Sequence, residues 1–107
     1  MSSEPNRETK VMTVLEAHVA SEQWDTLRST FAENSNRLPS QMVEMFLVQG
    51  TADTTLWRGI SIWRSRQALD EYRQSVETPG GILMFRSVGA EPTLAIFDVL
   101  VDAHHAT

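Results

Sequence analysis

The alternation of apolar and polar positions along the chain predicts four strands. Each predicted strand is rich in apolar and β-branched residues and is bounded by polar or glycine-containing segments. The ranges are residues 11–19, 42–50, 56–63 and 93–101. The segment GTADT, residues 50–54, has a glycine and an aspartate and predicts a turn that joins the second and third strands as a hairpin.

Two helices are predicted between these strands, each from apolar residues that recur on one helical face. The first has such residues at spacing i, i+3 and i+7, namely Trp24, Leu27 and Phe31. We expect Ser21 to cap this helix and the segment ENSNRLPS, residues 33–40, to end it.

The second predicted helix repeats this spacing with Leu69, Tyr72 and Val76 and has Ser65 as its expected N-cap. The segment TPGG interrupts it, and residues 82–88 are expected to add one or two helical turns.

This order of elements, β-α-β-β-α-β, is typical of the ferredoxin-like arrangement. We therefore predict an α+β fold in which two helices cover one face of a four-stranded antiparallel sheet. A chain of 107 residues is long enough for one hydrophobic core, so residues 10–102 are predicted to form a single domain. Residues 1–9 are expected to be a disordered leader and residues 103–107 a flexible tail.

Large apolar residues fall on both faces of the predicted sheet, although the chain has helices for only one. In the first strand, Met12, Val14, Glu16 and His18 alternate with residues of the helix-facing side. An uncovered apolar sheet face of this size would favour association. The sequence therefore predicts a homodimer that forms through the open sheet face.

Composition narrows the possible functions. The net charge is −5 and basic residues are scattered among acidic ones, which argues against nucleic-acid binding. The chain has no cysteine, so it forms no disulfide and a cytoplasmic location fits. No apolar run is long enough to span a membrane. No metal-binding or nucleotide-binding motif is present, and the PGG at residues 79–81 predicts only a turn, so we predict no metal and no cofactor.

The stretch IWRSRQALDEYRQS, residues 62–75, joins an apolar strand to a helix through Trp63 and a polar pair. This stretch and the order of elements resemble the antibiotic-biosynthesis monooxygenase-like family of dimeric α+β barrels, over roughly residues 10–102. The final TLAIFDVLVD resembles the closing strand of the haem-degrading members. The resemblance implies a dimer and, in several branches of the family, oxygenation of a quinol or an aromatic polyketide without a cofactor.

The residues that mark two branches of that family are largely replaced here. The quinol-oxidising pattern has an Asn four residues before the Trp and a Tyr six residues after it, where this chain has Gly59 and Leu69. The haem-degrading pattern has Asn, Trp and His where this chain has Ala17, Tyr72 and about Ile82. Without the axial His, haem degradation is not the expected activity.

Small residues on the helix-facing side of the sheet predict a pocket beside Trp63. Strand parity places Ala17, Gly59 and Ser61 on that side. We expect Leu69 and Phe85 to complete an apolar wall of the kind that binds small molecules. The alternative is that Trp63 only fills the core.

Two further residues are candidates for chemistry in this pocket. Tyr72 could donate a hydrogen bond to a substrate oxygen, or its hydroxyl could simply face water. Arg86 could stabilise an oxyanion, or it could be a solvated surface arginine. Glu16 and His18 share a strand face and could form a general base, but parity places them on the open face, where an interface pair is expected.

Two functions remain open on this basis. One is a cofactor-independent monooxygenase of a small aromatic or quinol substrate, with Trp63, Tyr72 and Arg86 as its catalytic residues. The other is a non-catalytic dimeric module that binds a small hydrophobic ligand.

Overall fold

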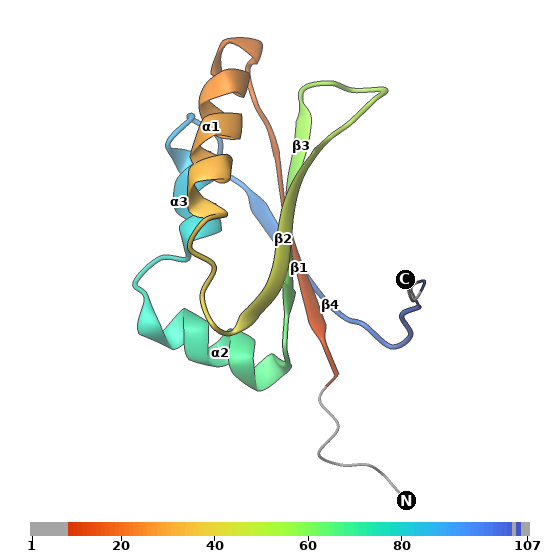
Figure 1. Cartoon of the computed structure of the whole chain (residues 1–107). Coiled ribbons are helices and arrows are strands. Elements are labelled where there is room, and N and C mark those ends of the chain that lie inside the picture. The colour runs from red at the N-terminus through yellow and green to blue at the C-terminus, as the bar shows by residue number, and fades with distance from the viewer. Residues whose placement is uncertain (1–8, 104, 106–107) are drawn as a thin grey trace, which may run out of the picture.

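In the computed structural model, which describes residues 9–103 and 105, four strands form one antiparallel sheet (Figure 1). The strand order across the sheet is β2-β3-β1-β4. The strands are β1 (Val11–His18), β2 (Met42–Gln49), β3 (Leu56–Trp63) and β4 (Thr93–Asp98).

The helices all lie on one side of this sheet (Figure 1). A 3₁₀ turn, η1 (Ser21–Gln23), leads into α1 (Trp24–Asn34), and α2 (Arg66–Ser75) is followed by α3 (Gly80–Arg86). The segment expected to add one or two turns thus forms a helix of its own, so three α-helices cover the sheet in place of the predicted two. The predicted ferredoxin-like α+β fold is confirmed.

The cap of α2 forms as predicted, because the Ser65 side chain accepts a hydrogen bond of 3.0 Å from the backbone N–H of Ala68. The prediction for Ser21 was wrong. The chain passes through η1 before the α-helix begins, so Gln23 occupies the N-cap position of α1 and makes no side-chain cap bond.

The last strand is shorter than predicted. It ends at Asp98, and only one further bond, from the N–H of Val99 to the Lys10 carbonyl, extends the pairing with the chain before β1. Leu100 and Val101 beyond it are 83% and 88% exposed. The predicted leader and tail lie outside the described residues, apart from residues 9, 103 and 105.

Two apolar clusters hold the helices on the sheet. The larger contains Trp57 and Phe85 together with residues of α1, α3 and the β1 end: Ala17, Val19, Leu27, Met84, Val88 and Ala90. The smaller contains Val11, Trp63 and Leu69. Because Trp57 and Trp63 are the second and last residues of β3, the two clusters occupy opposite ends of that strand.

The other face of the sheet is apolar around one ion pair. Neighbouring strands place Met12, Ile62 and Phe97 in one row of this face and Val14, Ile60 and Phe46 in the next. Beside them Arg58 donates to Glu16 at 2.7 Å. No described element covers this face (Figure 1).

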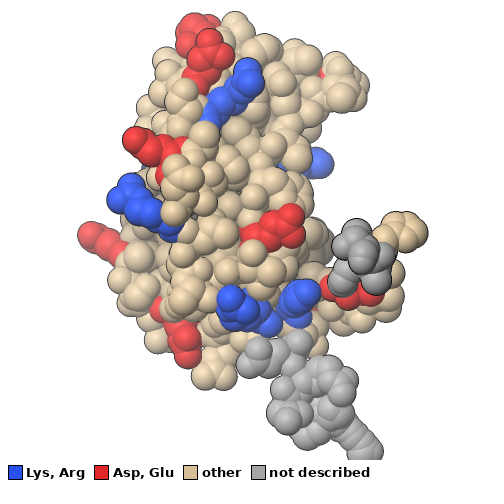
Figure 2. Space-filling model, in the orientation of Figure 1, with Lys and Arg blue, Asp and Glu red and all other residues tan. Residues whose placement is uncertain are grey.

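Charged side chains form no single-sign patch on the face shown in Figure 2, where acidic and basic groups are spread over the surface. Within residues 9–103 and 105, no helix has the length and apolar character needed to cross a bilayer.

Truncation of the larger cluster should destabilise the fold strongly. Phe85 is fully buried, so Phe85→Ala removes a ring and leaves a cavity, and we expect a loss of about 3–5 kcal/mol in the free energy of unfolding. Leu83, on the same helix and 52% exposed, is the matched control, and Leu83→Ala should cost about 0.5 kcal/mol or less. Urea unfolding at one fixed protein concentration measures both, and equal losses would contradict this packing.

Candidate functional site

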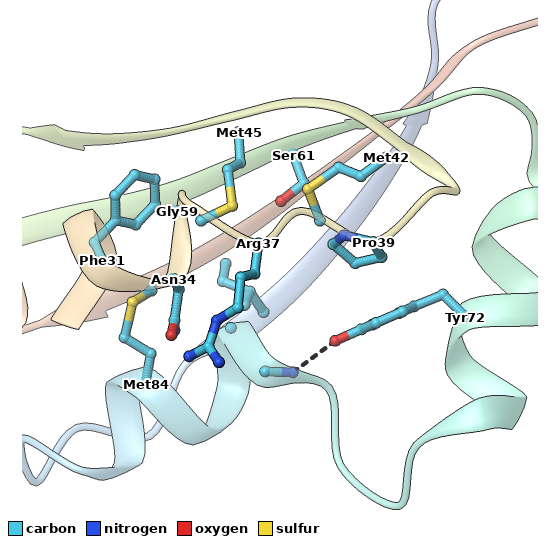
Figure 3. Close-up of a pocket in the computed structure, with 13 residues that line it drawn as sticks. Phe31, Asn34, Arg37, Pro39, Met42, Met45, Gly59, Ser61, Tyr72 and Met84 are labelled. Carbon is cyan, nitrogen blue, oxygen red and sulfur yellow. Dashed lines mark hydrogen bonds between the residues drawn. The ribbon is translucent and has the colours of Figure 1, made fainter.

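A cavity of about 320 Å³ lies between the sheet and the helices (Figure 3). Its floor is formed by side chains of the sheet, namely Leu15, Met42, Met45, Gly59 and Ser61. Its walls come from the helices and from the connection between α1 and β2: Phe31, Asn34, Arg37, Pro39, Tyr72, Gly80, Gly81 and Met84. We call this space the main cavity.

A side pocket of about 70 Å³ adjoins the main cavity and reaches Trp63. The two spaces share Leu15, Met42, Ser61, Tyr72 and Gly81. The side pocket is completed by residues of α2, of the segment around α3 and of the strand ends: Thr13, Trp63, Leu69, Arg73, Pro79, Ile82 and Leu94.

The main cavity exists because the two apolar clusters leave the middle of the sheet unfilled. Between Trp57 and Trp63, strand β3 turns only Gly59 and Ser61 toward the helices. A Cβ atom on Gly59 would sit 3.4 Å from the Phe85 ring, so α3 approaches the sheet closely at this position. The glycine adds no side chain to the floor, and it lines the main cavity with Ser61.

Trp63 fills the core and also forms a wall of the side pocket, so both interpretations of this residue hold. It is 4% exposed and belongs to the smaller cluster. Its indole N–H donates to the Thr13 hydroxyl at 2.9 Å, and both groups are buried. This bond satisfies a buried donor and fixes the orientation of the ring. By contrast, the buried indole N–H of Trp57 has no partner within the described part of the chain.

Tyr72 lies where the two spaces meet. Its hydroxyl oxygen accepts a hydrogen bond of 3.0 Å from the backbone N–H of Gly80, the first residue of α3 (Figure 3). Its ring packs on Trp63 with the centroids 5.0 Å apart. The hydroxyl proton is therefore available to donate to a group inside the cavity.

The other predicted pocket residues are divided between cavity and core. Gly59 and Ser61 line the main cavity, and Leu69 lines the side pocket. Ala17 and Phe85 lie on the expected side of the sheet but within the larger cluster, where neither lines the two spaces. Parity placed Ala17 correctly and Phe85 reaches the same face from α3, but both residues are packed within the core.

Arg86 was predicted in the pocket, and the structure places it elsewhere. Its guanidinium donates two hydrogen bonds of 2.9 Å to the Glu91 carboxylate on the exposed end of α3. These bonds hold the pKa of Glu91 below its ordinary value and raise the pKa of Arg86. Arg86 is thus a solvated surface arginine, which was the alternative interpretation.

Glu16 and His18 do not pair with each other. Glu16 accepts from Arg58, while His18 Nδ1 lies 2.9 Å from the Thr55 hydroxyl and 3.6 Å from Asp53. Hydrogen bonds from the Thr55 hydroxyl and N–H hold the pKa of Asp53 below its ordinary value. Neither Glu16 nor His18 lines the main cavity or the side pocket, so the two do not form the general base considered for them.

Sequence reasoning missed the polar part of the cavity, which comes from the end of α1 and the connection to β2. Asn34 and Arg37 lie in a segment considered only as a helix terminator. One signal was available for Asn34, because it follows Phe31 by three residues and Leu27 by seven and so shares their helical face. No such signal marks Arg37, which lies beyond the helix.

The described residues that line the two spaces do not form a metal site. Among the described residues no cluster of three or more His, Cys, Asp or Glu side chains occurs. Among the described residues that line the two spaces, the ionisable side chains are Arg37, Tyr72 and Arg73. Since no imidazole or thiolate faces either space, the described residues do not fit a haem with such an axial ligand.

Solved structures share this architecture. A protein described as a putative antibiotic biosynthesis monooxygenase from Deinococcus radiodurans matches with a TM-score of 0.68 at 9% identity, over 91% of this chain and 99% of its own. A variant of SnoaB, a cofactor-independent oxygenase from Streptomyces nogalater, matches with a TM-score of 0.64 at 17% identity, over 88% and 96%. This chain has their fold. The predicted resemblance is thereby confirmed at the level of architecture.

The same fold also occurs in a heme-degrading protein from Mycobacterium tuberculosis, with a TM-score of 0.69 at 14% identity over 92% of this chain and 99% of that one. No family model and no curated protein matches the sequence. At these identities the likeness is one of fold, and the chemistry must be argued from the cavity.

The bond between Trp63 and Thr13 should appear as an energetic coupling. In a double-mutant cycle of Trp63→Phe and Thr13→Val, we expect a coupling of about 1 kcal/mol in the free energy of unfolding, because either variant alone already removes the bond. Chemical denaturation of the four proteins measures it. The control pairs Thr13→Val with Trp24→Phe, since the Trp24 indole donates to the Val19 carbonyl, and this pair should be additive. Additivity in the first cycle would contradict the assigned bond.

Proposed function

We propose that this chain binds a small aromatic or quinol molecule in the main cavity and oxygenates it without a cofactor. The observation that carries the proposal is the cavity itself, which is largely apolar and is lined by Tyr72 where it meets the side pocket. An apolar space with a few fixed polar groups is the usual form of a small-molecule site. SnoaB, which shares this fold, is a cofactor-independent oxygenase, and this supports the choice of reaction.

In such a reaction the substrate supplies the electrons. An activated ring CH₂ group reacts with O₂, one oxygen atom becomes its carbonyl oxygen, and the other leaves as water with the two hydrogens that the carbon loses. The protein's part is to favour the anionic form of the substrate, which reacts with O₂, and to exclude water.

Tyr72 and Trp63 have separate roles in this proposal. The Tyr72 hydroxyl donates to the oxygen on which negative charge develops, and the Gly80 N–H holds it in place. The Trp63 N–H is already bonded to Thr13, so the indole acts as an apolar wall and not as a donor. Arg86 has no role, because it is bonded to Glu91 outside the cavity.

A second candidate function is a binding module without catalysis. The described lining contains neither an imidazole nor a carboxylate to take a proton from the substrate. The oxygenase proposal therefore requires a substrate acidic enough to ionise through hydrogen bonding alone, and a ligand that lacks such a proton would only bind.

We also propose that two copies pair through the open sheet face. This face carries a continuous apolar surface, with Phe46 37% and Phe97 49% exposed. Isologous pairing of two such faces would remove it from water and would place the Arg58–Glu16 pair at the interface.

The oxygenase proposal is tested with 1,8-dihydroxyanthrone under ¹⁸O₂. We expect protein-dependent formation of the anthraquinone with one ¹⁸O atom at the new carbonyl, measured by mass spectrometry. Tyr72→Phe should lower the rate above background at least about tenfold, because it removes the donor to the developing oxyanion.

The matched control is Arg86→Gln, which alters an arginine outside the cavity and should leave the rate unchanged. Circular dichroism and the midpoint of thermal unfolding check that each variant is folded. Saturable binding of the anthrone without ¹⁸O incorporation would replace the oxygenase proposal with the binding module. Absence of both would overturn the cavity as a ligand site.

The dimer is tested by sedimentation equilibrium. The parent chain is expected to sediment as a dimer, and Phe97→Glu should shift it toward the monomer because a carboxylate would have to be buried in the interface. Leu83→Glu introduces the same charge at a comparably exposed position on the helix side and should leave the dimer intact. A monomeric parent chain would contradict the proposal.

A further inference from the structure

The charge of the ligand site is opposite to that of the whole chain. The net charge of the protein is −5, yet the combined lining of the main cavity and the side pocket contains two arginines and no carboxylate. The two are Arg37, at the end contributed by α1, and Arg73, on α2. An anionic group in this space would therefore meet only positive charge among the described lining residues.

Arg37 differs from most other arginines of the structure in having no anionic partner. Four arginines pair with carboxylates, in the pairs Arg28–Asp25, Arg58–Glu16, Arg66–Asp70 and Arg86–Glu91. Arg37 forms no ion pair with any residue in the described ranges, and its five N–H donors are available to a ligand.

The backbone that carries Arg37 is held in place by hydrogen bonds. The Arg37 N–H donates to the Asn34 carbonyl at 3.1 Å, which ends α1 in a turn. Further along, Arg64 at the end of β3 donates its Nε to the Ser40 carbonyl at 2.8 Å and its backbone N–H to the Gln41 carbonyl at 3.0 Å. These two bonds attach the connection to the end of β3 at a point beyond Arg37 in the sequence.

The rest of the main cavity suits an aromatic ring. Figure 3 shows Asn34 on the α1 side of the cavity and Tyr72 on the α2 side, with the Arg37 side chain extending between them toward α3. Much of the remaining wall is apolar, and three residues are methionines, whose sulfur atoms pack well on aromatic rings: Met42, Met45 and Met84. The Arg37 guanidinium and the Tyr72 hydroxyl are therefore two separate polar groups on one apolar cavity.

We propose that the natural ligand is an aromatic molecule with a carboxylate and that Arg37 binds this carboxylate on the α1 side of Tyr72. This inference rests on the proposed function, because it names the substrate class of the same cavity. The planar guanidinium accepts a carboxylate in a bidentate pair, which gives orientation as well as affinity. The carboxylate fixes which end of the ring system faces Tyr72, so Arg37 is a specificity-determining residue.

The test compares 2-naphthoate with 2-naphthamide, which has nearly the same shape and no charge. Isothermal titration calorimetry measures the dissociation constant of each for the parent chain and for Arg37→Gln. We expect the parent to bind the naphthoate about tenfold more tightly than the amide, which corresponds to about 1.4 kcal/mol. Arg37→Gln should weaken naphthoate binding about tenfold and change amide binding less than about twofold.

Two arginine variants serve as controls. Arg28→Gln removes the same charge from an exposed position of α1 outside both spaces and should leave both dissociation constants unchanged. If Arg73→Gln, and not Arg37→Gln, removes the preference for the naphthoate, the assignment to Arg37 is overturned. Circular dichroism verifies the fold of every variant.

The outcomes separate this inference from the proposed function. Equal binding of the two ligands by the parent, or an unchanged preference in Arg37→Gln, would overturn the carboxylate inference while leaving the aromatic site in place. Binding of neither ligand would overturn both.

Discussion

Strand β3 turns four residues toward the helices, and their sizes run large, small, small, large: Trp57, Gly59, Ser61 and Trp63. The two indoles belong to two separate clusters at opposite ends of the strand, while α3 approaches the middle of the sheet at Gly59 and Leu15. The small residues between the indoles leave the rest of the centre unfilled. The cavity is therefore a consequence of how the core is divided, and it persists without any strained backbone or charged group to hold it open.

This division also separates the apolar and polar parts of the site. The sheet supplies a floor that is aliphatic and thioether apart from Ser61, whereas most polar atoms come from chain segments that run over the cavity: Asn34, Arg37 and the Tyr72 hydroxyl. Tyr72 links both parts, because its ring packs on Trp63 while its oxygen is bonded to the first residue of α3. A ligand that touched both Tyr72 and Arg37 would thus contact α2 and the connection between α1 and β2.

Local patterns in the sequence were sufficient for most of the fold. The strands follow from alternation, and α2 follows from its Ser65 cap and its apolar spacing, since both signals depend only on nearby residues. The side of the sheet on which Ala17 lies was predictable from parity, but the exclusion of Ala17 and Phe85 from the cavity depends on how the helices pack. Arg86 was misplaced because its partner, Glu91, lies in the loop after α3. Arg37 was missed because a segment that ends a helix has no local sequence signal to show that it also lines a cavity.

The connection between α1 and β2 supplies Arg37 and Pro39 to the cavity but no residue to either apolar cluster. Substitutions there would alter what the cavity recognises while leaving the supports of the helix layer untouched. The clusters, in turn, tolerate little change in volume without loss of the fold. Substitutions in this one short exposed segment can therefore change the ligand during evolution while the fold is kept. Around the side pocket the two roles coincide, because Trp63 and Leu69 both line it and support the fold.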